Sequence, residues 1–183
     1  MKKAKILCVI DAQNDFIDGV LGTKEAVEAV PAIVEKIKNW DGVIFYTKDT
    51  HDGKYPETLE GRKLPTAHCK KGTDGWKLNK DILIAIDEAM AYPCIEKSAF
   101  GTFALADAVK KHCKQFGIDN EEKLEITLIG FCTDICVVTN ALLLKTAFPE
   151  SEVSVDSSAC AGTSPSFHKA ALVTMKSCQI NIF

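Results

Sequence analysis

Cys136 is the residue of this 183-residue sequence whose type and position are best suited to chemistry. It closely follows Gly130-Phe-Cys-Thr133, a stretch that predicts a sharp turn from a strand into a helix, with Thr133 as the helix cap. Cys136 then falls in the first helical turn, where the helix dipole and free backbone N–H groups lower the pKa of a thiol and favour the reactive thiolate. The same N–H groups could receive the negative oxygen of a tetrahedral intermediate. The sequence is equally compatible with a buried cysteine that serves only as a small hydrophobic side chain.

Two charged residues are candidate partners for this thiol. Asp11 ends the apolar run 6–10, so we expect it to be partly desolvated, with a raised pKa that suits a general base. Lys97 follows another strand-like run and could hold the charges of both Asp11 and Cys136. The alternatives are a solvated strand end or helix cap for Asp11 and an ordinary surface lysine for Lys97.

A candidate metal site is indicated by Asp49 and His51. Alternate residues at a strand end point the same way, so this carboxylate and imidazole could bind one ion, and His68 could supply a third ligand. An open site of nitrogen and oxygen ligands suits Zn²⁺, Mn²⁺ or Fe²⁺. A chance Asp-x-His pair is the alternative. His112 and His168 fall within helical patterns and are predicted to be surface residues.

The elements that must position these residues alternate along the chain. Short apolar runs predict strands at 5–10, 43–47, 93–96, 124–129, 153–156 and 179–182, and 3.6-residue periodicity predicts helices at 24–39, 102–116, 133–147 and 164–176. Such alternation predicts one three-layer α/β domain over 1–183, with helices on both faces of a mainly parallel sheet. Ligands bind at the carboxyl ends of such strands, where the residues discussed above lie. The polar segment 51–79 interrupts the alternation, and irregular stretches of this length are often functional.

Composition narrows the classes of function. An apolar fraction of 46% with a net charge of -3 excludes intrinsic disorder, and no apolar run is long enough for a membrane span. Nucleic-acid binding is not expected, because Arg62 is the only arginine and the lysines are spread along the chain. The eight cysteines include no C-x-x-C pair, and no secretory signal opens the sequence, so we expect free thiols in the cytoplasm.

Four blocks of sequence carry a resemblance to the isochorismatase-like cysteine hydrolases, and most closely to their nicotinamidase branch. They are VIDAQNDF at 9–16, DTH at 49–51 with HC at 68–69 and GT at 72–73, EKSAF at 96–100, and GFCTDICV at 130–137. The resemblance implies a six-stranded sheet of the Rossmann type and a homo-oligomer. It also implies a non-proline cis peptide between Phe131 and Cys132, and an oxyanion hole formed by the backbone N–H groups of Cys132 and Cys136.

The same resemblance assigns roles to the candidate residues. It implies a catalytic triad of Asp11, Lys97 and Cys136. It also implies a divalent metal ion, most commonly zinc, with the ligands Asp49, His51 and His68. The family branch that cleaves a vinyl ether lacks the cysteine, so Cys136 indicates amide hydrolysis through a thioester. The metal residues favour a nicotinamidase-like enzyme that converts nicotinamide, or a related small amide, to the acid and ammonia.

One departure from the nicotinamidase pattern concerns the substrate pocket. Nicotinamidases commonly carry an aromatic residue shortly before the last metal histidine, whereas this chain has Leu64-Pro-Thr-Ala before His68. Phe16 and Leu64 are therefore the expected pocket walls, with Trp76 as a further candidate. Two alternatives stay open: a metal-free hydrolase of ureido or N-carbamoyl compounds, and a thiol redox protein in which Cys132 resolves an oxidised Cys136.

Overall fold

The fold is built on a six-stranded sheet with the strand order β3-β2-β1-β4-β5-β6, in which every pair of neighbours is parallel. The computed structural model describes residues 3–183, so the first two residues of the predicted domain lie outside it. The strands are β1 (Ala4–Ile10), β2 (Val43–Asp49), β3 (Ile95–Lys97), β4 (Leu124–Phe131), β5 (Glu152–Ala161) and β6 (Asn181–Ile182). The sequence-based prediction of a six-stranded α/β sheet is therefore confirmed.

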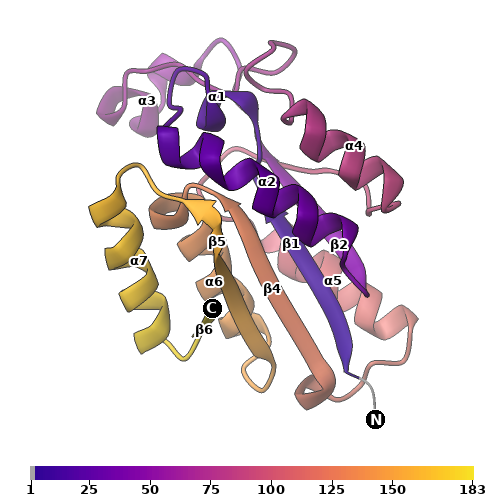
Figure 1. Ribbon diagram of the computed structural model, residues 1–183. Coiled ribbons are helices and arrows are strands. Elements are labelled where there is room, and N and C mark those ends of the chain that lie inside the picture. Colours follow the sequence, from indigo (N-terminus) through magenta and orange to yellow (C-terminus); the bar gives the residue numbers. More distant parts are fainter. Residues whose placement is uncertain (1–2) are drawn as a thin grey trace.

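Helices cover both faces of this sheet (Figure 1). Against one face lie α2 (Lys24–Lys38) and α4 (Lys80–Glu88), and against the other lie α5 (Phe103–Gln115), α6 (Val138–Ala147) and α7 (Pro165–Ser177). The short helices α1 (Asn14–Ile17) and α3 (Leu59–Lys63) lie near the carboxyl ends of the strands. The remaining short elements are the 3₁₀ turns η1 (Tyr55–Glu57) and η2 (Glu121–Lys123), and the π-helical turn η3 (Thr133–Val137).

The central strand β1 shows why the chain folds into three layers. Its residues alternate between two hydrophobic cores: Ile6 and Cys8 pack with α5–α7, whereas Leu7 and Val9 pack with α2 and α4. A strand that is apolar on both faces cannot remain in contact with water on either side, so helices must cover both. The apolar stripe of α2, which includes the fully buried Ile33, completes one of these cores.

Several elements differ from the sequence-based prediction. β5 extends to Ala161, five residues beyond its expected end, and α4 was not predicted. The helix expected over 133–147 begins as η3 and continues as α6. Segment 51–79 is irregular, as predicted, apart from the single turns η1 and α3.

Two histidines expected at the surface are less exposed than predicted. His112 is buried against Phe45 and Tyr92, and its Nδ1 lies 2.9 Å from the Tyr92 hydroxyl. His168 is half-buried, with its Nδ1 2.8 Å from Oγ1 of Thr133. Both predictions were wrong because a helical pattern does not reveal that a polar partner on another element lets an imidazole face inward.

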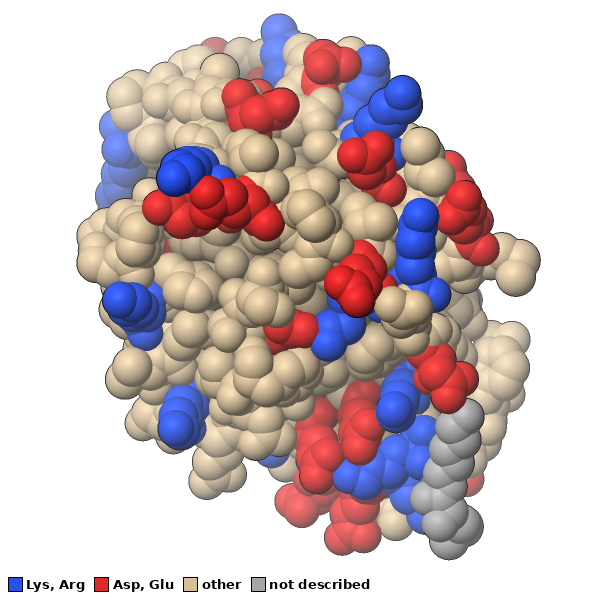
Figure 2. All heavy atoms as spheres, in the orientation of Figure 1, with Lys and Arg blue, Asp and Glu red and all other residues tan. Residues whose placement is uncertain are grey.

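The surface carries both signs of charge. On the face drawn in Figure 2, basic and acidic side chains are interspersed rather than separated into patches of one sign. Within residues 3–183, no helix is long and apolar enough to cross a bilayer.

Candidate active site

Asp11, Lys97 and Cys136 meet at the carboxyl edge of the sheet, as predicted. Asp11 directly follows β1, Lys97 is the last residue of β3, and Cys136 lies in η3 after β4. The Lys97 ammonium lies 2.7 Å from Oδ2 of Asp11 and 3.5 Å from Sγ of Cys136. All three residues are buried, so one ammonium contacts both a carboxylate and a thiol away from water.

The two oxygens of Asp11 have different surroundings. Oδ1 accepts a hydrogen bond of 2.7 Å from the hydroxyl of Thr47, whereas Oδ2 faces Lys97 and has no hydrogen-bond partner of proper geometry. Burial raises the pKa of Asp11, as expected, and the charge of Asp49 adds to this effect, while the Lys97 ammonium opposes it. Burial alone would lower the pKa of Lys97, but the charges of Asp11 and Asp49 outweigh it and raise this pKa, and a thiolate at Cys136 would raise it further. The raised pKa therefore favours the positively charged form of Lys97.

The thiol of Cys136 does not have the low pKa expected from its place near a helix start. Burial raises the pKa of Cys136 well above its usual value, the neighbouring charge of Asp11 raises it further, and Lys97 compensates only in part. The expectation was wrong because the helix dipole is a partial charge, whereas complete desolvation and a nearby carboxylate act on the whole thiolate. The raised pKa favours the protonated thiol, and this proton must be removed for Cys136 to act as a nucleophile.

The turn that carries Cys136 is held by hydrogen bonds at both of its ends. The carbonyl of Cys132 accepts hydrogen bonds from the N–H groups of Ile135 at 3.1 Å and Val137 at 3.0 Å. The side-chain amide of Asn140 donates to the carbonyl of Cys136 at 2.8 Å. The peptide between Phe131 and Cys132 is cis, as the family resemblance implied.

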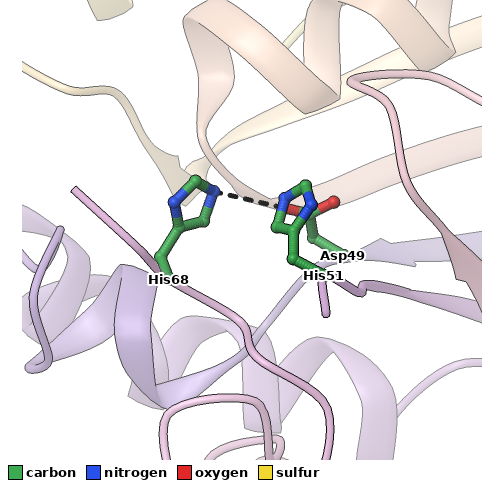
Figure 3. Close-up of side chains that lie close together, drawn as sticks. All are labelled: Asp49, His51 and His68. Atoms are coloured by element: carbon green, nitrogen blue, oxygen red, sulfur yellow. Dashed lines mark hydrogen bonds and ion pairs between the residues drawn. The ribbon is translucent and has the colours of Figure 1, made fainter. Parts of the chain in front are cut away.

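Asp49, His51 and His68 form a second cluster beside the triad, and all three are buried (Figure 3). Nε2 of His51 lies 2.9 Å and Nε2 of His68 lies 3.3 Å from Oδ2 of Asp49, and one potential ligand atom from each residue lies within 4.8 Å of the others. Nδ1 of His68 lies 2.9 Å from the carbonyl of Thr66. An N–H donated from Nδ1 to that carbonyl orients Nε2 toward the cluster, which is the common orientation of a metal-binding histidine.

The donor atoms of this cluster suit a divalent metal ion. Burial raises the pKa of Asp49, but the hydrogen bonds from His51 and His68 outweigh it, so this pKa is lowered and the carboxylate is ionised. Two imidazoles and one carboxylate are the ligand types of open zinc sites. Lys97 lies 3.5 Å from Oδ1 of Asp49 and therefore joins the metal cluster to the triad.

A cavity of about 350 Å³ opens onto both clusters. Phe16 and Leu64 line it, as predicted, whereas Trp76 does not. The indole N–H of Trp76 instead donates to Oγ1 of Thr50 at 2.9 Å, and its ring faces the ammonium of Lys48. The lining is mainly apolar, with a few polar groups, and consists of Phe16, Leu21, Gly22, Thr23, Asp49, Glu60, Leu64, His68, Phe100, Cys132, Ile135, Cys136 and Thr163.

Glu60 is a residue at this site that the sequence did not reveal. It lies on α3, lines the cavity, and places Oε1 3.8 Å from Nε2 of both His51 and His68. Its carboxylate could therefore approach the same ion. It is one of three acidic residues between His51 and His68, in a segment whose short helix was not predicted, so nothing in the sequence distinguishes it from Asp52 or Glu57. Thr47 was missed for a similar reason, because it lies within an ordinary strand pattern.

Comparison with known proteins agrees with this fold. The chain is 35% identical over 155 residues to an isochorismatase family protein named PncA from Bacillus subtilis (strain 168), with 78% of each chain covered. Its fold matches a nicotinamidase/pyrazinamidase structure from Bacillus subtilis with a TM-score of 0.80 at 23% identity, over 100% of this chain and 99% of that one. A pyrazinamidase of Pyrococcus horikoshii in complex with zinc matches with a TM-score of 0.74 at 25% identity, over 98% of each chain.

The family model that matches is the isochorismatase domain, over residues 5–182. This range includes every strand end that contributes to the triad and to the metal cluster. Since the match spans nearly the whole chain and the relative from Bacillus subtilis agrees with it, the protein belongs to the isochorismatase family.

Proposed function

We propose that this protein is a cysteine amidohydrolase that converts nicotinamide, or a related small amide, to the acid and ammonia. The observation that carries the proposal is the contact of one ammonium, Lys97, with both a carboxylate and a thiol at the wall of an apolar cavity. A thiol paired with a base at a ligand cavity is the arrangement of covalent acyl transfer. The structural relatives described as nicotinamidases and pyrazinamidases support a pyridine or pyrazine amide as substrate.

The first step is removal of the thiol proton by Asp11. Its Oδ2 is the oxygen that Thr47 leaves free, and burial of Asp11 makes it a stronger base than an exposed aspartate. Sγ of Cys136 then forms a bond to the amide carbon, and the carbonyl oxygen becomes negative. The backbone N–H groups of Cys132 and Cys136 are the proposed donors to that oxygen. Lys97 balances the charge that moves between Asp11 and Cys136.

The second step releases ammonia and regenerates the thiol. Asp11 passes its proton to the leaving nitrogen, the C–N bond breaks, and a thioester to Cys136 remains. Asp11 then takes a proton from a water molecule, whose oxygen attacks the thioester carbon. The C–S bond breaks, the acid leaves, and Asp11 returns the proton to Sγ of Cys136. Each proton that Asp11 takes up is returned before the cycle ends, so no other reactant is needed.

Asp49, His51 and His68 are the proposed ligands of a divalent ion, with zinc favoured over manganese or iron by the ligand types. Bound there, the ion would supply a Lewis acid that holds a substrate ring nitrogen or orders water. The chain's own contribution to substrate binding is the apolar wall formed by Phe16 and Leu64. We further propose one domain over 1–183 that acts in the cytoplasm as a homo-oligomer on a small-molecule amide.

An ammonia-release screen of the zinc-loaded protein tests this function. The substrates are nicotinamide, pyrazinamide, N-carbamoyl amino acids and ureidoacrylate, each at millimolar concentration. We expect turnover of nicotinamide and pyrazinamide. This turnover should be lost when the metal is removed. If carbamoyl or ureido compounds were hydrolysed without metal while nicotinamide gave no ammonia, the nicotinamidase assignment would fail and only the cysteine-hydrolase class would remain.

A further inference from the structure

The turn between β1 and α1 contributes more than the general base. Asp11 and Gln13 in this turn and Asp15 at the start of α1 alternate along the chain, and all three are buried although each side chain is polar. Buried polar groups are costly unless they are hydrogen-bonded, so their partners indicate what they are for. Asp11 belongs to the triad, whereas the partners of Gln13 and Asp15 are the backbone segments that carry the metal ligands.

The side-chain amide of Gln13 forms hydrogen bonds with both the N–H and the carbonyl of Asp49. Its side-chain oxygen accepts from the N–H of Asp49 at 2.7 Å, and its side-chain N–H₂ donates to the carbonyl of Asp49 at 2.9 Å. The paired register of β1 and β2 ends at Val9 and Tyr46, before Asp49 is reached. On the side of β2 that faces β1, the Gln13 amide thus supplies the hydrogen bonds that a residue of β1 would otherwise make to Asp49. A second N–H of the same amide donates to the carbonyl of Trp76 at 2.9 Å.

Asp15 holds the chain immediately after His68. Its Oδ2 accepts from the N–H of Cys69 at 2.7 Å, and Cys69 has a φ of 46°, a left-handed conformation that is unfavourable for a residue other than glycine. The carboxylate is enclosed by the same loop, because a Cβ on Gly75 would come within 2.2 Å of it. This hydrogen bond therefore fixes a turn that has little local preference of its own.

We infer that Gln13 and Asp15 are positioning residues that set the affinity of the site for its metal ion. The inference rests on the metal site proposed above and extends it to residues that do not touch the ion. Asp49 pairs with Lys97 at the end of β2, and a single backbone bridge joins His51 to the chain just after His68, so regular structure fixes the approach of Asp49 and His68 only in part. The hydrogen bonds from Gln13 to Asp49 and from Cys69 to Asp15 hold the backbone at both ligands to the same short stretch of chain. The ligands are thereby preorganised, so less conformational entropy is lost when the ion binds.

Zinc affinity, measured by competition with a chromophoric chelator on metal-free protein, tests this inference. Gln13→Leu and Asp15→Ala should each weaken Zn²⁺ binding by about 10–100-fold, the usual effect of removing a residue that orients a metal ligand. Asp15→Asn keeps an acceptor for the Cys69 N–H and should restore affinity close to wild type. Folding of each variant is judged by circular dichroism. If Gln13→Leu does not fold, Gln13→Met replaces it, because methionine is unbranched like glutamine.

Asn14→Ala is the matched control. Asn14 lies between the two positioning residues and donates a hydrogen bond of 2.9 Å to the carbonyl of Asp74, which neither ligates nor adjoins a ligand. This variant should bind Zn²⁺ as the wild type does. A wild type that bound no Zn²⁺ would refute the metal site itself. Folded Gln13 and Asp15 variants with wild-type affinity, or an equal loss in Asn14→Ala, would refute only the positioning role.

Discussion

The hydrogen bond from Thr47 to Asp11 offers a direct test of the proposed general base. Thr47 is fully buried, and its hydroxyl donates to Oδ1 of Asp11 at 2.7 Å while accepting from the N–H of Asp11 at 3.2 Å. Thr47→Val replaces that hydroxyl with a methyl group of similar size. The carboxylate then loses a donor that stabilises its charged form, so the pKa of Asp11 should rise further above its usual value.

The size of the effect follows from the type of hydrogen bond. A hydrogen bond to a charged group contributes roughly 1.5–3 kcal/mol. If Asp11 must be ionised to take the thiol proton, kcat/KM on the acid side of the profile should fall by about 10-fold to 100-fold. The acid limb should move to higher pH, and the rate above that limb should approach wild type. The measurement is the pH profile of kcat/KM for ammonia release.

Two further variants keep this test specific. Thr47→Ser retains the hydroxyl and should keep the acid limb near its wild-type position. Thr174→Val makes the same chemical change on α7, where the hydroxyl donates to the carbonyl of Ala170, and should leave the profile unchanged. An unshifted acid limb in a folded Thr47→Val protein would show that Asp11 is not the group whose ionisation controls the rate. A Thr47→Ser protein that behaved like Thr47→Val would assign the effect to packing instead.

Three further predictions follow from the same site. Cys136→Ala should abolish ammonia release with little loss of stability. Cys132→Ala should keep substantial activity, because only the backbone N–H of Cys132 is proposed to act. An active Cys136→Ala and an inactive Cys132→Ala in the ammonia-release assay would favour the thiol redox alternative. His51→Ala should lose the roughly one equivalent of metal expected in wild type purified without chelator, as measured by elemental analysis, and full retention of metal would contradict the ligand assignment. Leu64→Trp should lower the KM for nicotinamide by up to about tenfold, since a second ring opposite Phe16 adds about 0.5–1.5 kcal/mol of stacking, and an unchanged KM would show that this wall does not face the ring.

The sequence by itself identified the strands and the residues at their ends. Alternation of apolar runs with helical periodicity predicted the α/β layers, because both patterns are local consequences of burying one face of a helix or both faces of a strand. Asp11, Lys97 and Cys136 could be found in the same way, since each lies at or just after the end of a strand and parallel strands end at one edge. Asp49 and His51 were recognisable as a pair because alternate residues of a strand share a side.

The tertiary structure decided what depends on neighbours from other elements. The direction of the Cys136 pKa shift is one example, because complete burial and the charge of Asp11, which follows a different strand, outweigh the local helix dipole. Glu60 is another, since its distance to His51 and His68 depends on the path of segment 51–79, which has little periodicity. Trp76 faces Lys48 rather than the cavity for the same reason. Periodicity records only which face of an element is buried, whereas desolvation and charge contacts arise when distant segments pack together.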